Sequence, residues 1–209
     1  MNRAQNVLII PDSFKDSISS IEFCTIAKDA ILKMNPQTHI QTIPMADGGE
    51  GSIDVFRYIK GYDYQTARVK NPLGKNITTE YCIKKNTDTA MIEMAKASGL
   101  QMISKSQRNP MKTSTFGTGQ LILDAINSGV KKIILFIGGS ATNDIGVGML
   151  DALGFKFYNY EDKLFTGHVN NIPKIVRIEK PRNVKRLREI SFVVACDVST
   201  RLLGPNGAT

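Results

Sequence analysis

The stretch that most constrains this chain is Gly138–Asp144, a Gly-Gly-Ser-Ala-Thr-Asn-Asp loop between two regular elements. The apolar, β-branched run Lys131–Ile137 before it predicts a strand, and Gly146–Leu153 after it carries apolar residues at helical spacing. A loop that opens a helix offers unpaired N–H groups and the positive end of the helix dipole to an anion. The candidate anion-binding residues of this loop are Gly138, Gly139, Ser140, Asn143 and Asp144.

This loop matches neither of the two common phosphate-binding patterns. It lacks the lysine of Gly-x-x-x-x-Gly-Lys-Ser/Thr, and its spacing is not that of Gly-x-Gly-x-x-Gly. The spacing alone leaves two interpretations open, a ligand-binding loop and a plain turn with a helix cap.

Composition indicates an ordinary globular protein. The chain has 209 residues, which is enough for one large domain or two small ones. No apolar run approaches membrane-spanning length, and the polar N-terminus does not resemble a signal peptide. The cysteines (24, 82 and 196) are scattered and the histidines (39 and 168) isolated, which indicates reduced thiols and disfavours a zinc site. We therefore expect a cytoplasmic protein with no membrane partner.

The net charge of +8 comes largely from Lys174–Glu189, which holds seven basic and two acidic residues. We interpret this segment as a solvated surface. A nucleic-acid partner is disfavoured, because the segment contains no aromatic residue that could stack on bases. A net positive charge is also compatible with an enzyme that binds anionic substrates.

The N-terminal segment predicts a parallel crossover unit. Residues 6–10 and 39–43 are expected strands, and the capping box that starts at Ser19 predicts a helix over 20–34 between them. The polar loops that follow the two strands would then lie at one edge of the sheet, where open α/β sheets bind ligands. These loops contribute the candidates Asp12, Ser13, Lys15, Asp47, Gly48, Gly49 and Glu50.

Further along, the pattern predicts a hairpin from residues 62–69 and 77–84 and a strand over 89–94. Thr115 and Gly117 precede an expected helix, where they could bind phosphate or simply cap the helix. The apolar segment Ser191–Ala195 predicts a buried strand, and Asp197 follows it as a further candidate acid.

The acids of the loop Met45–Gly51 are the best candidates for chemistry. Asp47 with Glu50 could hold Mg²⁺ or take a proton from an acceptor hydroxyl, as phosphoryl transfer requires. The alternative is a turn with exposed acids. Lys15 could neutralise a phosphate or carboxylate, and otherwise is a surface lysine. No Ser-His-Asp or Cys-His arrangement is evident.

The motifs closely resemble those of the bacterial glycerate kinase family, and their order and spacing agree along nearly the whole chain. The resemblance rests on six blocks: Ile10–Lys15, Pro44–Gly51, Ile92–Leu100, Arg108–Gly119, Ile137–Asp144 and Ala195–Ala208. It implies ATP-dependent phosphorylation of D-glycerate to 2-phosphoglycerate, or to 3-phosphoglycerate, with ATP and Mg²⁺ as cofactors. It further implies an α/β fold of two nested domains with Rossmann-like or flavodoxin-like parallel sheet units, one domain inserted in the other and the active site between them.

By the same resemblance, Asp47, Lys15 and Asp197 are expected as catalytic residues, and the other candidates as substrate or phosphate ligands. Asp47 would act as a base or metal-associated acid, and Lys15 would bind negative charge on glycerate or phosphate. No residue is assigned as a dedicated metal ligand.

The chain departs from the family pattern in three places. Ile145 stands where the family has glycine, and glycines are lost around His168. Family chains are about twice as long, so the resemblance covers their N-terminal half. We expect residues 1–70 to form part of the first domain and residues 71–209 to form the inserted one. The alternative function is that of a shortened, inactive homologue that binds only a ligand or a partner chain. The expected polypeptide partner is a second copy of the chain, in a homo-oligomer, or a C-terminal half.

Overall fold

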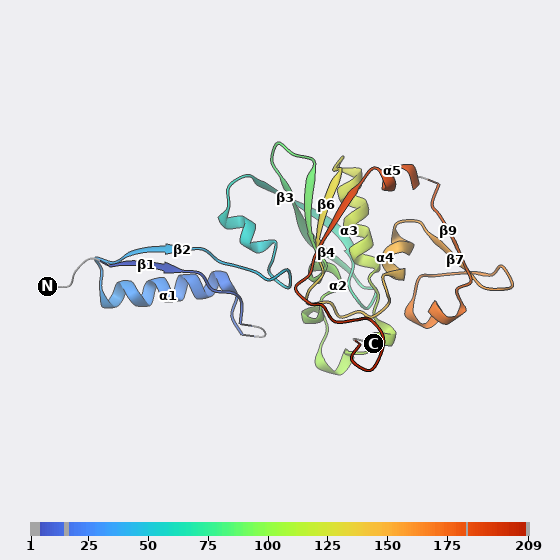
Figure 1. Ribbon diagram of the computed structural model, residues 1–209, viewed down its shortest axis with the longest axis horizontal. Helices are drawn as coiled ribbons and strands as arrows, with labels where there is room; N and C mark the ends of the chain where they lie inside the picture. The colour runs from blue at the N-terminus through green and yellow to red at the C-terminus, as the bar shows by residue number, and fades with distance from the viewer. Residues whose placement is uncertain (1–4, 15–16, 183, 208–209) are drawn as a thin grey trace.

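The computed structural model describes residues 5–14, 17–182 and 184–207, and it has a mixed α/β fold with three separate sheets. The chain begins with the predicted crossover unit. Strands β1 (Asn6–Ile9) and β2 (His39–Thr42) pair in parallel, and helix α1 (Ser20–Met34) connects them. This unit extends away from the other sheets (Figure 1).

Helix α1 has the predicted bounds because both halves of its capping box form. The Ser19 side chain accepts a hydrogen bond from the Glu22 N–H, and the Glu22 carboxylate accepts one from the Ser19 N–H. Asn35 ends the helix in an extended conformation, just before Pro36.

The largest sheet has five strands in the order β10-β6-β5-β4-β3. It is mixed, since it contains the predicted hairpin, which is confirmed, together with parallel pairing in the other part of the sheet. The outer hairpin pairs antiparallel, β4 is antiparallel to β5, and β5, β6 and β10 run parallel to one another. The strands are β3 (Tyr62–Lys70), β4 (Asn76–Lys84), β5 (Thr89–Glu93), β6 (Lys132–Phe136) and β10 (Ser191–Ala195).

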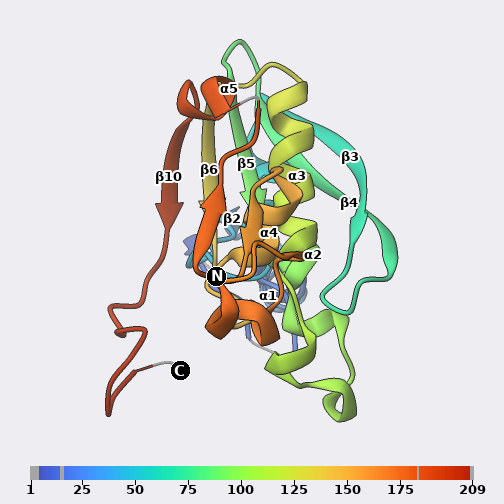
Figure 2. The same cartoon turned by 90° about the vertical axis from the view of Figure 1, so that its right-hand side faces the viewer.

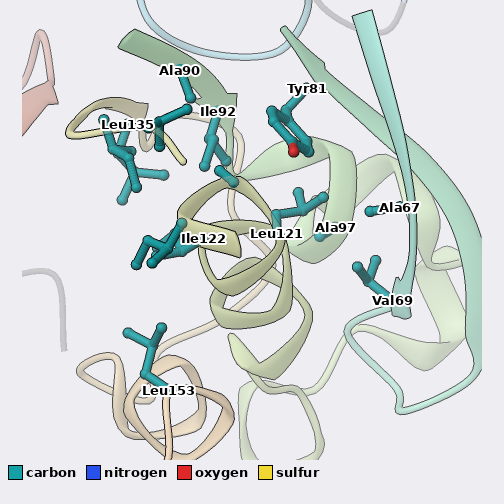
Figure 3. Packing of buried hydrophobic residues seen from close by; sticks show 14 residues of the cluster. Ala67, Val69, Tyr81, Ala90, Ile92, Ala97, Leu121, Ile122, Leu135 and Leu153 are labelled. Atoms are coloured by element: carbon teal, nitrogen blue, oxygen red, sulfur yellow. The ribbon is translucent and has the colours of Figure 1, made fainter. Parts of the chain in front are cut away.

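The main hydrophobic core lies between this sheet and helix α3 (Phe116–Asn127). Leu121 and Ile122 of α3 point into the core, where they meet Ile92 of β5 and Leu135 of β6 (Figure 3). The short helices α2 (Ala95–Ser98) and α4 (Val147–Ala152) pack beside α3.

The remaining elements are short. A small antiparallel sheet contains β7 (Lys156–Tyr158), β8 (Leu164–Phe165) and β9 (Arg177–Glu179), and α5 (Val184–Arg188) precedes β10. A five-residue 3-10 helix, Asp54–Tyr58, follows the loop after β2. Further 3-10 turns are Leu100–Met102, Lys105–Gln107, Pro110–Lys112 and Val169–Lys174. No helix among the described residues is long and apolar enough to cross a membrane.

The prediction for the last strand is contradicted by the structure. Strand β10 lies at the edge of the large sheet (Figure 2), and Phe192, Val193 and Val194 are exposed, so the prediction of a buried strand is wrong. An apolar run is typical of a strand covered on both faces, and here nothing among the described residues covers β10. The domain boundary predicted after residue 70 stays a prediction. In the structure this boundary falls within the hairpin, between β3 and β4, which are paired with each other.

Glycines on α3 allow it to approach its neighbours closely. A Cβ on Gly119 would overlap the Met149 carbonyl oxygen and lie 2.7 Å from the Ala152 Cβ of α4. We expect Gly119→Ala to lower the free energy of unfolding by about 1–3 kcal/mol, the usual cost of overpacking. Urea unfolding followed by circular dichroism measures this. Asn127→Ala, at the exposed end of the same helix, should change stability by less than about 0.5 kcal/mol.

The loop before α4 holds an unfavourable residue. Ile145 has φ +46° and is 58% exposed, so a β-branched side chain adopts the left-handed conformation with little burial in return. We expect Ile145→Gly to raise the free energy of unfolding by about 1 kcal/mol. Asn86, also exposed and at φ +58°, is the matched control. Asn86→Gly should raise the free energy of unfolding by less, because asparagine tolerates this conformation. An equal increase in both variants would contradict the explanation.

Candidate functional site

A cleft of about 990 Å³ lies where loops at strand ends converge. One loop follows β1, one follows β2, one follows β6 and one follows β10, and each starts at the carboxyl end of its strand. Strands β1 and β2 form one sheet and β6 and β10 belong to another, so the loops come from two sheets. Within each sheet the two loops leave the same edge because the strands are parallel. Seven of the predicted residues line the cleft: Ser13, Asp47, Gly49, Glu50, Gly138, Gly139 and Asp197.

Direct backbone contact joins the loops that follow β2 and β6. The Gly138 N–H donates to the Gly48 carbonyl over 3.1 Å, and a Cβ on Gly138 would lie 2.5 Å from the Gly49 Cα. Gly48 has φ +93°, and a Cβ there would sit 3.4 Å from the Ala195 carbonyl oxygen at the end of β10. The glycines therefore let three loops meet at one point.

Asp47 and Glu50 are exposed acids on the first of these loops. The Asp47 Oδ1 accepts a hydrogen bond from the Gly49 N–H over 2.8 Å, which fixes the turn in an Asx-type geometry. Gly51 ends the loop at φ +83°. The two carboxylates line the cleft with Asp197, so the site can accept a proton or share a cation with a phosphate.

Glu93, at the end of β5, also lines this cleft and was not among the predicted site residues. Its side chain is fully buried, and its carboxylate accepts hydrogen bonds from the N–H groups of Gly51 and Ile53, each over 3.0 Å. Burial raises the pKa of Glu93, while these donors and the nearby Lys96 oppose the rise. An acid that ends an otherwise apolar strand is the sequence signal that could have identified it.

Most of the positive charge beside the cleft is paired. The Lys96 ammonium lies 2.8 Å from the Asp54 carboxylate, and Arg57 pairs with Glu80 and covers the Tyr64 ring. Arg108 differs, since its guanidinium has no ion-pair partner within the described parts of the chain. This exposed side chain is therefore a cation that an anionic ligand could use.

Asp144 and Thr115 form a buried cluster that does not line the cleft. The Asp144 carboxylate accepts hydrogen bonds from the Thr115 N–H and hydroxyl, and from the N–H groups of Gly146 and Gly148. The Thr115 hydroxyl oxygen accepts another from Met149. These contacts tie the start of α3 to the start of α4, so the structure gives both residues a fold-stabilising role. Helix α4 has only six residues, which weakens the dipole expected to face an anion.

The other predicted residues that the structure describes are not part of the cleft lining. Gly117 packs against the Lys70 backbone with no room for a Cβ, and the Ser140 hydroxyl bonds the Thr142 hydroxyl over 2.7 Å. Asp12 accepts from the Ser13 N–H, and Gly48 supports the loop contact described above. Asn143 is half-buried, and Lys15 lies outside the described residues.

No set of three or more His, Cys, Asp or Glu side chains is arranged to hold a metal ion by itself in the described segments. A Mg²⁺ ion that arrives with a nucleotide needs only one or two carboxylates besides phosphate oxygens and water. The exposed acids of the cleft fit that smaller requirement.

Several curated proteins of similar sequence are named glycerate kinases. The chain is 38% identical over 202 residues to the glycerate kinase of Halalkalibacterium halodurans, a match that covers 97% of this chain and 53% of that protein. It is 36% identical over 203 residues to the glycerate 2-kinase of Escherichia coli, again over 97% and 53% of the two chains. The chain thus spans about half the length of the curated relatives it matches.

The fold agrees with a solved structure described as a glycerate kinase 2 from Salmonella typhimurium LT2. The TM-score is 0.78 at 36% identity, over 99% of this chain and 55% of the other. The model of the glycerate kinase family matches residues 7–209. By sequence and by fold, this chain belongs to the glycerate kinase family.

Proposed function

We propose that this chain carries the substrate cleft of a glycerate kinase, which transfers the γ-phosphoryl group of ATP to D-glycerate. The observation that carries the proposal is that two glycine-containing loops, after β2 and β6, meet the end of β10 at a cleft lined by Asp47, Glu50 and Asp197. Phosphorylation at the 2-hydroxyl is favoured by the name of the Escherichia coli relative, a glycerate 2-kinase. The 3-phosphate is the other product that the substrate allows.

The reaction assigned to the cleft is an in-line displacement. The glycerate hydroxyl oxygen forms a bond to the γ-phosphorus, the bond from that phosphorus to the β,γ-bridging oxygen breaks, and ADP leaves with the electron pair. Asp47 receives the hydroxyl proton, since it is exposed to the cleft and its loop is fixed at Gly49 and Gly138. Arg108 offers positive charge to the glycerate carboxylate or a phosphate.

Mg²⁺ would be held with the nucleotide by one or two of Asp47, Glu50 and Asp197. When bound, it neutralises charge on the β- and γ-phosphates. A cytoplasmic location follows as part of the proposal, because that is where ATP is available.

Glu93 is proposed as a positioning residue for this chemistry. Its carboxylate binds the N–H groups of Gly51 and Ile53, directly after the segment that carries Asp47 and Glu50. A fixed loop keeps a general base within reach of the proton it takes.

An inactive homologue is the second candidate, and a specific observation favours it. Ile145 occupies a left-handed conformation in the loop after β6, where the family pattern has glycine. A distortion of this loop would change the shape of the part of the cleft that Gly138 and Gly139 line.

Glycerate-dependent ADP release tests the proposed function. Since the relatives are about twice as long, the assay is run on the chain alone and on a fusion that continues it with the unmatched C-terminal part of the Halalkalibacterium halodurans enzyme. We expect turnover in at least one of the two proteins. Asp47→Asn should lower it by about 100-fold or more, the usual contribution of a general base.

Glu161→Gln is the matched control, because this exposed acid lies in the turn after β7, away from the cleft-lining residues. It should leave turnover unchanged. Folded protein without turnover in either form would contradict the proposal and identify an inactive homologue. Turnover retained in Asp47→Asn would remove Asp47 as the base.

The pH dependence of stability tests the burial of Glu93. Because burial raises its pKa in the folded state above the ordinary value of 4.5, Glu93 contributes most to stability below that pH. The contribution is lost as pH rises through the folded-state pKa. Urea unfolding measures the free energy of unfolding of the chain and of Glu93→Gln at several pH values. As pH rises, we expect the free energy of unfolding of the chain to fall relative to that of the variant.

The capping-box variant Glu22→Gln should show the opposite trend. Hydrogen bonds from Ser19 lower the pKa of Glu22, so its contribution is present above 4.5 and lost as pH falls. The same slope for both variants would contradict the assignment for Glu93.

A further inference from the structure

The start of helix α1 forms one wall of the cleft, and the chemistry proposed above does not use it. This wall contains Ser19, Ser20, Ile21 and Glu22, together with Phe14 from the loop after β1. The helix begins at the end of the crossover unit that lies nearer to the large sheet (Figure 1). A cleft of about 990 Å³ is at the upper end of the range for small-molecule sites, so it has room for a ligand larger than glycerate.

Two backbone N–H groups at the start of α1 are available to a ligand. The first four N–H groups of a helix have no partner within the helix. The capping box satisfies two of them, since the Glu22 carboxylate accepts the Ser19 N–H and the Ser19 hydroxyl accepts the Glu22 N–H. The N–H groups of Ser20 and Ile21 have no hydrogen-bond partner in the described parts of the chain. The helix has 15 residues, and the positive end of its dipole at this place favours an anion.

The Ser20 side chain adds a third donor beside these N–H groups. Ser20 is only 5% exposed and lines the cleft, and its hydroxyl has no hydrogen-bond partner among the residues that the structure describes. Among those residues, the one fully enclosed side-chain atom without a partner is the Thr38 hydroxyl, so the Ser20 hydroxyl is open to the cleft. The Glu22 carboxylate is directed to Ser19, whose N–H and hydroxyl both bind it. A hydroxyl and two N–H groups in one place suit the oxygens of a phosphate group.

Phe14 presents an aromatic ring on the same wall. Its ring contacts the Phe23 ring of α1, with 5.3 Å between the two centroids and an angle of 31° between the planes. Phe23 is three residues after Ser20, so both lie on one side of the helix. Phe14 is nonetheless 52% exposed and lines the cleft. An exposed ring that is supported by a second ring is suited to stack on a planar ligand, and every nucleobase offers a flat face for such stacking.

We propose that this surface, defined by Phe14, Ser20 and Ile21 and called here the α1 wall, binds an adenine nucleotide. The base stacks on the Phe14 ring. A phosphate group accepts hydrogen bonds from the N–H groups of Ser20 and Ile21 and from the Ser20 hydroxyl. The inference rests on the proposed function for the choice of adenine as the base. It assigns the nucleotide and the acids Asp47 and Glu50 to different elements that line one cleft.

The fluorescence of N-methylanthraniloyl-ADP measures nucleotide binding by the chain. We expect Phe14→Leu to raise the Kd about 10-fold, because leucine is apolar but has no ring on which a base can stack. Phe14→Tyr keeps the ring and should bind with an unchanged Kd. Tyr160→Ala is the matched control, since this aromatic residue is 93% exposed and is not among the cleft-lining residues.

Tripolyphosphate and adenosine, used as competitors, separate the two parts of the α1 wall. Ser20→Ala should weaken the binding of tripolyphosphate about 10-fold, the usual effect of losing a hydrogen bond to a charged group, and leave adenosine unaffected. Phe14→Leu should weaken adenosine and leave tripolyphosphate unaffected. In amide NMR spectra of the unsubstituted chain, the signals of Ser20 and Ile21 should shift when tripolyphosphate is added. This last measurement tests the site even where a variant fails to fold.

Several results would overturn the proposal. They are the absence of nucleotide binding by the folded chain, a Kd that stays unchanged in Phe14→Leu or in Ser20→Ala, and amide signals of Ser20 and Ile21 that do not respond to tripolyphosphate. Nucleotide binding that depends on Phe14 and Ser20, without glycerate-dependent ADP release, would support the α1 wall and contradict the proposed function. Glycerate-dependent ADP release with an unchanged KM for ATP in both variants would do the opposite, so the two failures are distinguishable.

Discussion

The site depends on a backbone contact between two glycine loops. A Cβ on Gly138 would lie 2.5 Å from the Gly49 Cα, and the Gly138 N–H donates to the Gly48 carbonyl. Any side chain at Gly138 would push the loop after β6 away from the loop after β2. The crossover unit is joined to the large sheet through this contact, because the second loop leads from β2 toward β3. The absence of two Cβ atoms thus sets the distance between the acids of one loop and the backbone of the other.

Burial divides the acids of this region into two groups. Glu93 and Asp144 are fully enclosed, and their carboxylates accept backbone N–H groups from the loops around them. Such carboxylates stabilise loop geometry, because a buried charge must be hydrogen-bonded. Asp47, Glu50 and Asp197 are exposed to the cleft, where they can change protonation or bind a cation. Through these hydrogen bonds, the buried acids fix the backbone of the region in which the exposed acids lie.

The core of the molecule is buried, whereas one edge strand of the large sheet is exposed. The core between α3 and the large sheet contains residues such as Leu121, Ile122 and Ile133 with almost no exposure. The same sheet ends in β10, whose apolar side chains face solvent on both sides. The chain matches 55% of the solved structure that it resembles, and the core between α3 and the large sheet lies within the matched part.

The sequence by itself determined the local structure and the family. The capping box at Ser19 predicted α1 with its bounds, and turn residues after successive strands predicted the loops that converge on the cleft. These features were predictable because they depend on neighbours within a few residues. The motif blocks were enough to identify the glycerate kinase family.

Only the tertiary structure decided which polar residues face the cleft. Asp144 resembles a ligand-binding residue in the sequence, but in the structure its carboxylate is buried and accepts the Thr115 N–H at the start of α3. Glu93 joins the site because β5 ends beside Gly51, a contact across more than 40 residues. An apolar run such as residues 192–194 predicts burial without specifying what covers it. Burial depends on which elements pack against a strand in the folded protein, and local sequence does not specify them.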